Sequence, residues 1–344
     1  MRKQTKLAVV LAAAAVLVLG ASMTSFAAKG WQDENGTWYF YDNNGEKVTD
    51  TWKKSGKDWY WLGDDGAMVT NRLVEDGEYT YYVNANGAMV KDTWVAIESD
   101  DADADLGVDY RWYYFRTNGK AQKETTSQKP VTIHGKKYMF DTEGKMLFGF
   151  VEGGDMINDV DDAILQCKYY FGNNNDGAMH TGWLLYSDGL DDVKYEDDNE
   201  FWFYFKPSNG QKYESADKKI SGKTYRFDEN GVMKHGWNAP EASDATESKY
   251  FSGIDDGSMK KKTWVYAVPS KELNETDHDD DKKRWFYVEN SGYMVSNTVK
   301  KIKGKWYCFD DCGRMKKGLQ VLDSDKITDV TSWVSKADDE LDKD

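Results

Sequence analysis

Histidine is scarce in this chain of 344 residues, which has only His134, His180, His235 and His278. These four residues lie far apart in the sequence, and no H-E-x-x-H motif joins two of them. The sequence also has no G-x-S-x-G motif and no phosphate loop. Enzymes built on a metal, a triad or a nucleotide need such residues. We therefore predict a protein that is not an enzyme and has no cofactor and no metal site.

Cysteine is equally rare, with three residues. Cys308 and Cys312 flank one predicted turn, and in an exported protein they would form either a disulfide or two free thiols. Cys167 would then remain as a buried thiol. The framework of a disulfide-rich secreted domain is excluded by these numbers.

Long apolar runs are missing after the amino terminus, where Leu7–Leu19 follows Arg2, Lys3 and Lys6 and precedes a small-x-small site at Ser25-Phe26-Ala27. This pattern predicts a signal peptide over residues 1–27, because the run is too short to span a bilayer comfortably. We expect an exported protein with no membrane span after signal removal. No L-P-x-T-G motif is present, so we expect no covalent anchoring by a sortase.

Positively charged residues are also few relative to negatively charged ones, 45 against 60. The formal net charge is −15, and loss of the three signal cations would bring it to about −18, which argues against a nucleic-acid partner.

Aromatic residues are abundant instead, with 14 Trp and 22 Tyr. The stretch 218–237 shows how they are arranged. Ile220 is expected to open a short strand, Ser221-Gly222 to turn it, and Tyr225 and Phe227 to share one face of a second strand. One hairpin of this size is marginally stable in water, so it needs neighbours.

The same block recurs along the chain, which is typical of stacked repeats. We predict an all-β solenoid of stacked β-hairpins, about three hairpins per turn, because three kinds of hairpin alternate in a fixed order. The third kind has the longest acidic tip. The predicted domains are the signal peptide (1–27), a repeat domain of about eleven hairpins (28–318), and a closing segment with an acidic tail (319–344) that includes a short helix over 327–341. The first strands are expected at Trp31, Trp52, Leu73, Trp94, Ile133, Phe150, Trp183, Ile220, Trp237, Trp264 and Ile302, with Leu319 in the closing segment.

Insertions lengthen several hairpin tips, and all are acidic. We expect solvated loops there. Asp101, Asp103 and Asp105 have the spacing of a calcium loop, but neither its sixth-position Gly nor its twelfth-position Glu follows, which favours a loop without calcium. Carboxylates in the tips also leave open a wall hydrolase as an alternative function. The expected tip insertions are 96–109, 152–166, 186–200, 239–248 and 268–283.

The motif G-W-x(n)-G-x-W-Y-Y, seen at Gly30-Trp31…Gly36-Thr37-Trp38-Tyr39, resembles the choline-binding, or cell-wall-binding, repeats of Gram-positive bacteria and the related glucan-binding repeats. The resemblance implies ligand sites between consecutive hairpins. Each site would take the Gly-Trp tryptophan, the first aromatic of W-Y-Y, and a Tyr of the next hairpin. The candidate sets are Trp31, Trp38 and Tyr60; Trp52, Trp59 and Tyr81; Trp94, Trp112 and Tyr138; Trp183, Trp202 and Tyr225; and Trp264, Trp285 and Tyr307.

These rings could bind a quaternary ammonium by cation–π attraction, stack on sugars, or serve only as core. The resemblance implies a secreted, wall-associated surface protein whose partner is a cell-wall polymer, either choline-bearing teichoic acid or a glucan. The residues alone leave these alternatives open, as well as an adhesin whose protein partner reads the acidic tips.

Overall fold

The computed structural model describes residues 29–100, 103, 106–124, 128–157, 167–187, 200–239 and 245–317. The predicted signal peptide and the predicted closing segment, with the helix expected in it, lie outside these residues. The described chain forms two compact units, one containing the residues up to 180 and the other those from 181 onward.

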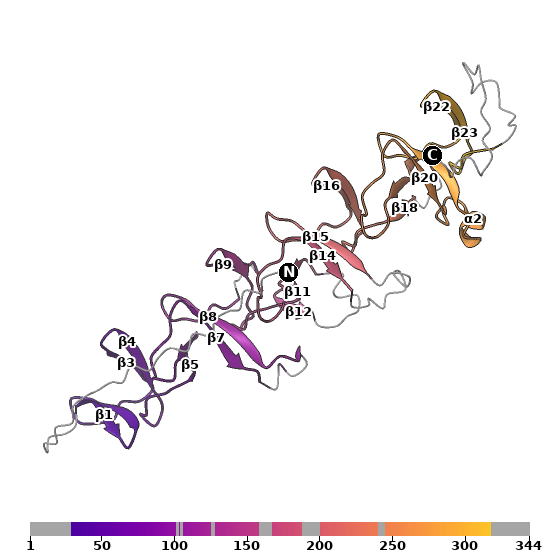
Figure 1. Ribbon diagram of the computed structural model, residues 1–344. Helices are drawn as coiled ribbons and strands as arrows, with labels where there is room; N and C mark the ends of the chain where they lie inside the picture. Colours follow the sequence, from indigo (N-terminus) through magenta and orange to yellow (C-terminus); the bar gives the residue numbers. More distant parts are fainter. Residues whose placement is uncertain are drawn as a thin grey trace, which may run out of the picture. The chain divides into compact units, whose positions relative to one another are not determined.

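The first unit contains six hairpins (Figure 1). A further strand, β12 (Asp155–Ile157), pairs with β11 on the side opposite β13. The hairpins are β1–β2 (Gly30–Glu34, Thr37–Tyr41), β3–β4 (Thr51–Ser55, Asp58–Leu62), β5–β6 (Arg72–Asp76, Tyr79–Val83), β7–β8 (Thr93–Glu98, Tyr110–Phe115), β9–β10 (Val131–Ile133, Lys136–Tyr138) and β11–β13 (Phe150–Glu152, Tyr169–Tyr170).

The second unit contains five hairpins and, in two tips, short helices: η3 (Ala245–Glu247) and α2 (Glu275–Asp279). The hairpins are β14–β15 (Gly182–Tyr186, Phe201–Phe205), β16–β17 (Ala216–Ile220, Lys223–Phe227), β18–β19 (Gly236–Asn238, Lys249–Phe251), β20–β21 (Thr263–Ala267, Arg284–Val288) and β22–β23 (Thr298–Ile302, Lys305–Phe309). The predicted all-β class built from stacked hairpins is confirmed by these two units.

Hairpins of one kind recur on the same side within each unit (Figure 1). In the second unit, β14–β15 and β20–β21 extend to one side, while β16–β17 and β22–β23 extend to the other. This recurrence after three hairpins is the one expected for about three hairpins per turn.

One prediction about the strands was wrong in detail. Ile220 closes β16 next to the Ser221-Gly222 turn and pairs with Lys223, so it does not open the strand. Both turn residues have positive φ, 47° and 86°, as a two-residue turn matching the strand twist requires. The position equivalent to Trp52 is therefore Asp217, and Trp237 follows it by 20 residues, close to the 21-residue spacing seen from Trp31.

The core of each unit is assembled from the ends of the second strands. From the second hairpin onward, one residue at the end of each second strand, or one or two residues after it, is almost completely shielded from solvent. Each hairpin contributes one such side chain, so burial depends on the neighbours in the stack. These residues are Leu62, Val83, Phe115, Phe140, Phe171, Phe205, Phe227, Phe251, Val288 and Phe309, all at most 2% exposed.

A methionine–glycine contact joins successive hairpins. The side chain of Met233 lies over the Cα of Gly257 in the next turn, where an added Cβ would come within 2.3 Å of it. Gly257 has a φ of 55°, so both its backbone conformation and the methionine above it select glycine. The same contact occurs at Met68–Gly87, Met89–Gly119, Met146–Gly177, Met259–Gly292 and Met294–Gly313.

Candidate ligand-binding site

A repeated backbone hydrogen bond fixes how each hairpin meets the one before it. The segment after the second strand donates an N–H to the carbonyl of the previous hairpin, at the position of the first aromatic of W-Y-Y. Met233 N–H donates to Trp202 O at 2.8 Å and Met315 N–H to Trp285 O at 2.8 Å. The bond recurs at Met68 to Trp38, Met89 to Trp59 and Met146 to Trp112. Because this bond is made by backbone, its geometry is the same at every site.

The Gly-Trp tryptophan meets the tyrosine of the next hairpin in all five candidate sets. The two rings are in contact and steeply inclined, at interplanar angles of 60° to 71°. The centroid distances are 5.4 Å for Trp31–Tyr60, 5.0 Å for Trp52–Tyr81, and 4.8 Å for Trp94–Tyr138, Trp183–Tyr225 and Trp264–Tyr307.

The second tryptophan of each set lies diagonally across the same hairpin face. Trp183 pairs with Tyr204, and Trp202 is two residues before Tyr204. The Trp183 and Trp202 rings are 6.1 Å apart at 86°, and the Trp264 and Trp285 rings are 6.2 Å apart at 85°. Register places Trp31 with Trp38, Trp52 with Trp59, and Trp94 with Trp112 in the same diagonal relation. We call each set of three rings an aromatic corner.

The rings of a corner differ in exposure in a way that suits a ligand. The tyrosines Tyr60, Tyr81, Tyr138 and Tyr225 are buried, whereas the tryptophans are half-buried or, for Trp59, 37% exposed. Burial raises the pKa of Tyr60, Tyr81 and Tyr138 above its ordinary value, so these phenols are neutral at physiological pH. Each corner therefore presents neutral ring surface to the solvent beside a buried aromatic wall.

The residue directly opposite the second tryptophan varies from one corner to the next. It is Asp33 opposite Trp38, Lys54 opposite Trp59, Ala96 opposite Trp112, Leu185 opposite Trp202 and Tyr266 opposite Trp285. Tyr266 stacks on Trp285 at 4.8 Å and 28°, which adds a fourth ring to the last corner. The sequence reasoning missed Tyr266, although its position two residues after Trp264 was a usable signal.

Some of the described hairpins do not assemble a complete aromatic corner. Trp237 contacts Phe286 of the next hairpin at 4.7 Å, yet the position for its second tryptophan is occupied by buried Ser248. Ile133 and Ile220 are buried beside their turns and belong to the core. Trp306 is the opposite case, because it occupies the second-tryptophan position while Val299 occupies the first.

Two acidic tips have many exposed residues, as expected of solvated loops, but one buried carboxylate anchors each of them. Asp103 is 4% exposed and forms ion pairs with Arg111 and Lys145. Asp277 is 4% exposed and forms ion pairs with Arg284 and Arg314, both at 2.8 Å. In both tips one cation directly precedes the second tryptophan and the other precedes the methionine of the next hairpin, a pattern readable from the sequence but missed.

The ion pairs of Asp277 have an electrostatic consequence. Hydrogen bonds from Arg284 and then Arg314 lower the pKa of Asp277 to about 2. The carboxylate therefore stays charged throughout the range in which proteins are normally studied. It ties the acidic tip, through Arg284, to the strand that carries Trp285.

The described residues offer little support for a metal site or a disulfide. Asp103 is engaged in ion pairs, and Asp101 and Asp105 lie outside the described residues. The ligand atoms of Asp310, Asp311 and Cys312 lie within 4.8 Å of one another, but Arg314 and Lys316 already pair with Asp310. Cys308 and Cys312 are free thiols, so the disulfide alternative is not realised. Within the described ranges, no helix is long and apolar enough to cross a membrane.

Comparison with known proteins gives matches at the repeats. The family described as "Choline-binding repeat" matches residues 28–72 and 48–94, and "Putative cell wall binding repeat" matches residues 108–121 and 218–233. Glucosyltransferase-S of Streptococcus downei is 28% identical over 218 residues, which make up 63% of this chain and 12% of that protein. The chain thus spans about an eighth of the length of this curated relative.

Two solved structures from Streptococcus pneumoniae are also similar. Choline binding protein F is 20% identical with a TM-score of 0.49, and the match covers 84% of this chain and 93% of that one. The modular autolysin LytC is 18% identical with a TM-score of 0.48, covering 84% of this chain and 53% of that one. The family matches agree with the resemblance predicted from the motif: residues 28–94, 108–121 and 218–233 are similar to choline-binding, or cell-wall-binding, repeats.

Proposed function

We propose that this chain is an exported, non-catalytic protein that attaches to the bacterial envelope by binding a cell-wall polymer, with each aromatic corner taking a quaternary ammonium group such as choline. The observation that carries the proposal is the recurrent contact between one tryptophan and the next tyrosine, at 4.8 to 5.4 Å in all five sets. The contact recurs because consecutive hairpins stack on one another in the same way.

The chemistry of the corner fits a cation without hydrogen-bond donors. A quaternary ammonium is held by ring faces, and each such contact contributes about 0.5–2 kcal/mol depending on desolvation. Neutral phenols and half-buried indoles supply these faces without requiring a polar partner. The matched choline-binding repeats include the first two corners, from Trp31 to Tyr81, which supports the same ligand class.

Retention on a choline resin, with elution by free choline, tests the proposal. Trp202→Ala should weaken retention, whereas Trp306→Ala is the matched control because Trp306 has no first tryptophan beside it. A protein that is retained neither by choline nor by purified cell wall would overturn the proposal. Clearing of a peptidoglycan suspension would instead revive the hydrolase alternative.

A second candidate function is the binding of an α-glucan. The similarity to glucosyltransferase-S favours it, since the match covers 63% of this chain. The same indole faces can stack on the C–H faces of sugars. Capture by dextran that free choline does not reverse would establish this function in place of choline binding.

Several corners on one chain should act together on a polymer. Linked weak sites gain avidity without new contacts. We propose that the tryptophan pairs of the hairpins with the long acidic tips, the third kind, form a row within each unit: Trp31/Trp38 with Trp94/Trp112 in the first, and Trp183/Trp202 with Trp264/Trp285 in the second. Replacing Trp202 and Trp285 together should lower the affinity for polymer more than for free ligand. Equal losses would exclude the multivalent mode.

A further inference from the structure

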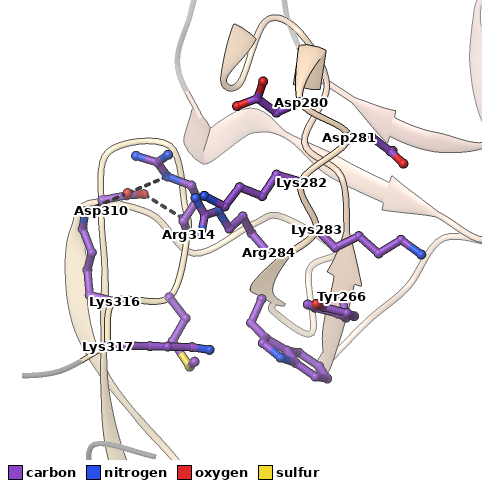
Figure 2. Close-up of a pocket in the computed structure, with 12 residues that line it drawn as sticks. Tyr266, Asp280, Asp281, Lys282, Lys283, Arg284, Asp310, Arg314, Lys316 and Lys317 are labelled. Atoms are coloured by element: carbon purple, nitrogen blue, oxygen red, sulfur yellow. Dashed lines mark hydrogen bonds and ion pairs between the residues drawn. The ribbon is translucent and has the colours of Figure 1, made fainter. Parts of the chain in front are cut away.

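The second unit has a large open pocket beside its last aromatic corner. The pocket has a volume of about 770 Å³ and lies between the tip of β20–β21 and the segment that follows β23. Figure 2 shows Lys282 and Lys283 coming from the tip, with Lys316 and Lys317 on the segment across from them. Trp285 and Tyr266 also line it, so the pocket continues from the aromatic corner.

The charge of this pocket is opposite to that of the chain. Its lining has six cationic side chains and three carboxylates, in a protein with a formal net charge of −15. The six cations are Lys282, Lys283, Arg284, Arg314, Lys316 and Lys317. A local excess of positive charge in an acidic protein attracts an anion that the remaining surface repels.

The cations divide into a fixed pair and a more exposed group. Arg284 and Arg314 donate to the carboxylate of Asp277, which holds their guanidinium groups in place. Lys282 and Lys283 are exposed, so their ammonium groups can reach a bound molecule, whereas Lys316 is exposed but pairs with Asp310 at 3.2 Å. The arginines therefore shape the pocket, and the lysines are the groups expected to contact an anion.

The floor of the pocket is aromatic. Tyr266 is 50% exposed and stacks on Trp285 at 4.8 Å. If one part of a ligand lay on these two rings, the lysines could contact the adjoining part of the same ligand. Ammonium groups beside a ring platform match a molecule that carries an anion next to a cation or a sugar.

On the basis of the proposed function, we propose that this pocket binds a phosphate group of the polymer, next to the unit held by the Trp264–Trp285–Tyr307 corner. The lysines bind the phosphate by charge-assisted hydrogen bonds. The adjoining choline or sugar lies on Tyr266 and Trp285. This last corner would then prefer a phosphorylated unit, while the Trp183–Trp202–Tyr225 corner serves as the comparison within the same protein.

The test follows the indole N–H signals of Trp285 and Trp202 by NMR during titration with choline, phosphorylcholine and glucose 6-phosphate. At low salt, phosphorylcholine should bind at Trp285 several-fold more tightly than choline. Lys282→Ala combined with Lys283→Ala should weaken phosphorylcholine binding there about fivefold to tenfold, by loss of two charge-assisted contacts, and change choline binding less than twofold. Lys57→Ala with Lys91→Ala, both exposed in the first unit, removes the same charge as a control.

Three outcomes decide the matter. If phosphorylcholine binds at Trp285 no more tightly than choline, the phosphate site is overturned while choline binding stands. An equal loss of choline affinity in the lysine variant also overturns it, because the lysines would then only support the corner. If choline moves neither signal but glucose 6-phosphate moves that of Trp285, the phosphate site stands and the choline ligand fails.

Discussion

The corners at β14–β15 and β20–β21 have nearly the same ring geometry in different surroundings. Their tryptophan pairs are 6.1 and 6.2 Å apart, and both first tryptophans are 4.8 Å from the next tyrosine. Yet Trp202 is preceded by buried Phe201, and Met233 by buried Val232, where the other corner has Arg284 and Arg314. Ring geometry is set by strand register and backbone hydrogen bonds, whereas the surroundings are free to change.

We call the Trp264–Trp285–Tyr307 set the ionic corner and the Trp183–Trp202–Tyr225 set the apolar corner. The largest effect is expected from removing the buried carboxylate of Asp277 beside the ionic corner. Asp277→Ala leaves Arg284 and Arg314 facing each other without their shared partner, which should destabilise β20–β21 by about 3–5 kcal/mol. Val232→Ala, the change at the apolar corner, should cost about 2 kcal/mol by leaving a small cavity. Amide hydrogen exchange of each hairpin measures both, and Asp279→Ala, on an exposed residue of α2, is the control. Equal costs for the two corners would contradict the comparison.

A smaller effect is expected at the contact between Met233 and the next turn. Gly257→Ala places a Cβ against the methionine and keeps a positive φ, so it should cost about 2 kcal/mol. Because Met233 N–H donates to Trp202 O, the indole signal of Trp202 should shift more than that of Trp285. A larger shift at Trp285 would show that the methionine does not brace its own corner.

The pH dependence should separate the two corners by a similar amount. Since the pKa of Asp277 is lowered to about 2, its stabilisation is fully present above the unfolded-state pKa near 4 and is lost as the pH falls toward 2. The stability difference between the unaltered protein and Asp277→Ala should therefore shrink by on the order of 2 kcal/mol over that range. The cost of Val232→Ala should stay constant, and urea unfolding at several pH values would measure both.

The smallest effect concerns the ring that only one corner has. Tyr266→Ala removes the side chain stacked on Trp285 and should weaken binding of choline there about threefold to fivefold, as expected for about 1 kcal/mol of aromatic contact. Leu185→Ala, at the same strand position opposite Trp202, should change affinity less than twofold. Titration followed at the two indole signals gives both affinities. Matching losses would mean that the position acts through strand stability.

Much of this architecture could be predicted from the sequence, because the repeat is visible there as a regular spacing of glycine and aromatic residues. The alternation of aromatic residues predicted the positions of the second strands. The motif positions predicted the contact between Trp264 and Tyr307, which lie in consecutive hairpins. Ile220 was misplaced because an apolar residue before a turn and one that opens a strand look alike when β-strands are short. Strand pairing resolves this difference, and composition does not.

The tips were less predictable for a physical reason. A run of aspartates is usually solvated, and whether one of them is buried depends on cations supplied by the second strand of the same hairpin and by the next hairpin. Asp277 meets Arg314 across 37 residues, so the contact shows in the sequence only once the tip is compared with the next hairpin. Tyr266 was overlooked because the family motif does not include its position, so the variable part of the corner lay outside the resemblance.

The methionine–glycine contact gives the stack a polarity. At six junctions one hairpin offers a methionine forward and the next a turn glycine backward, so the two sides of such a junction are not equivalent. A chain shortened from its carboxyl end at Met233 would leave that thioether uncovered and open to oxidation to the sulfoxide. A chain shortened from its amino end would expose a glycine, with no apolar side chain to protect. Shortening such a stack therefore exposes a different kind of surface at each of its two ends.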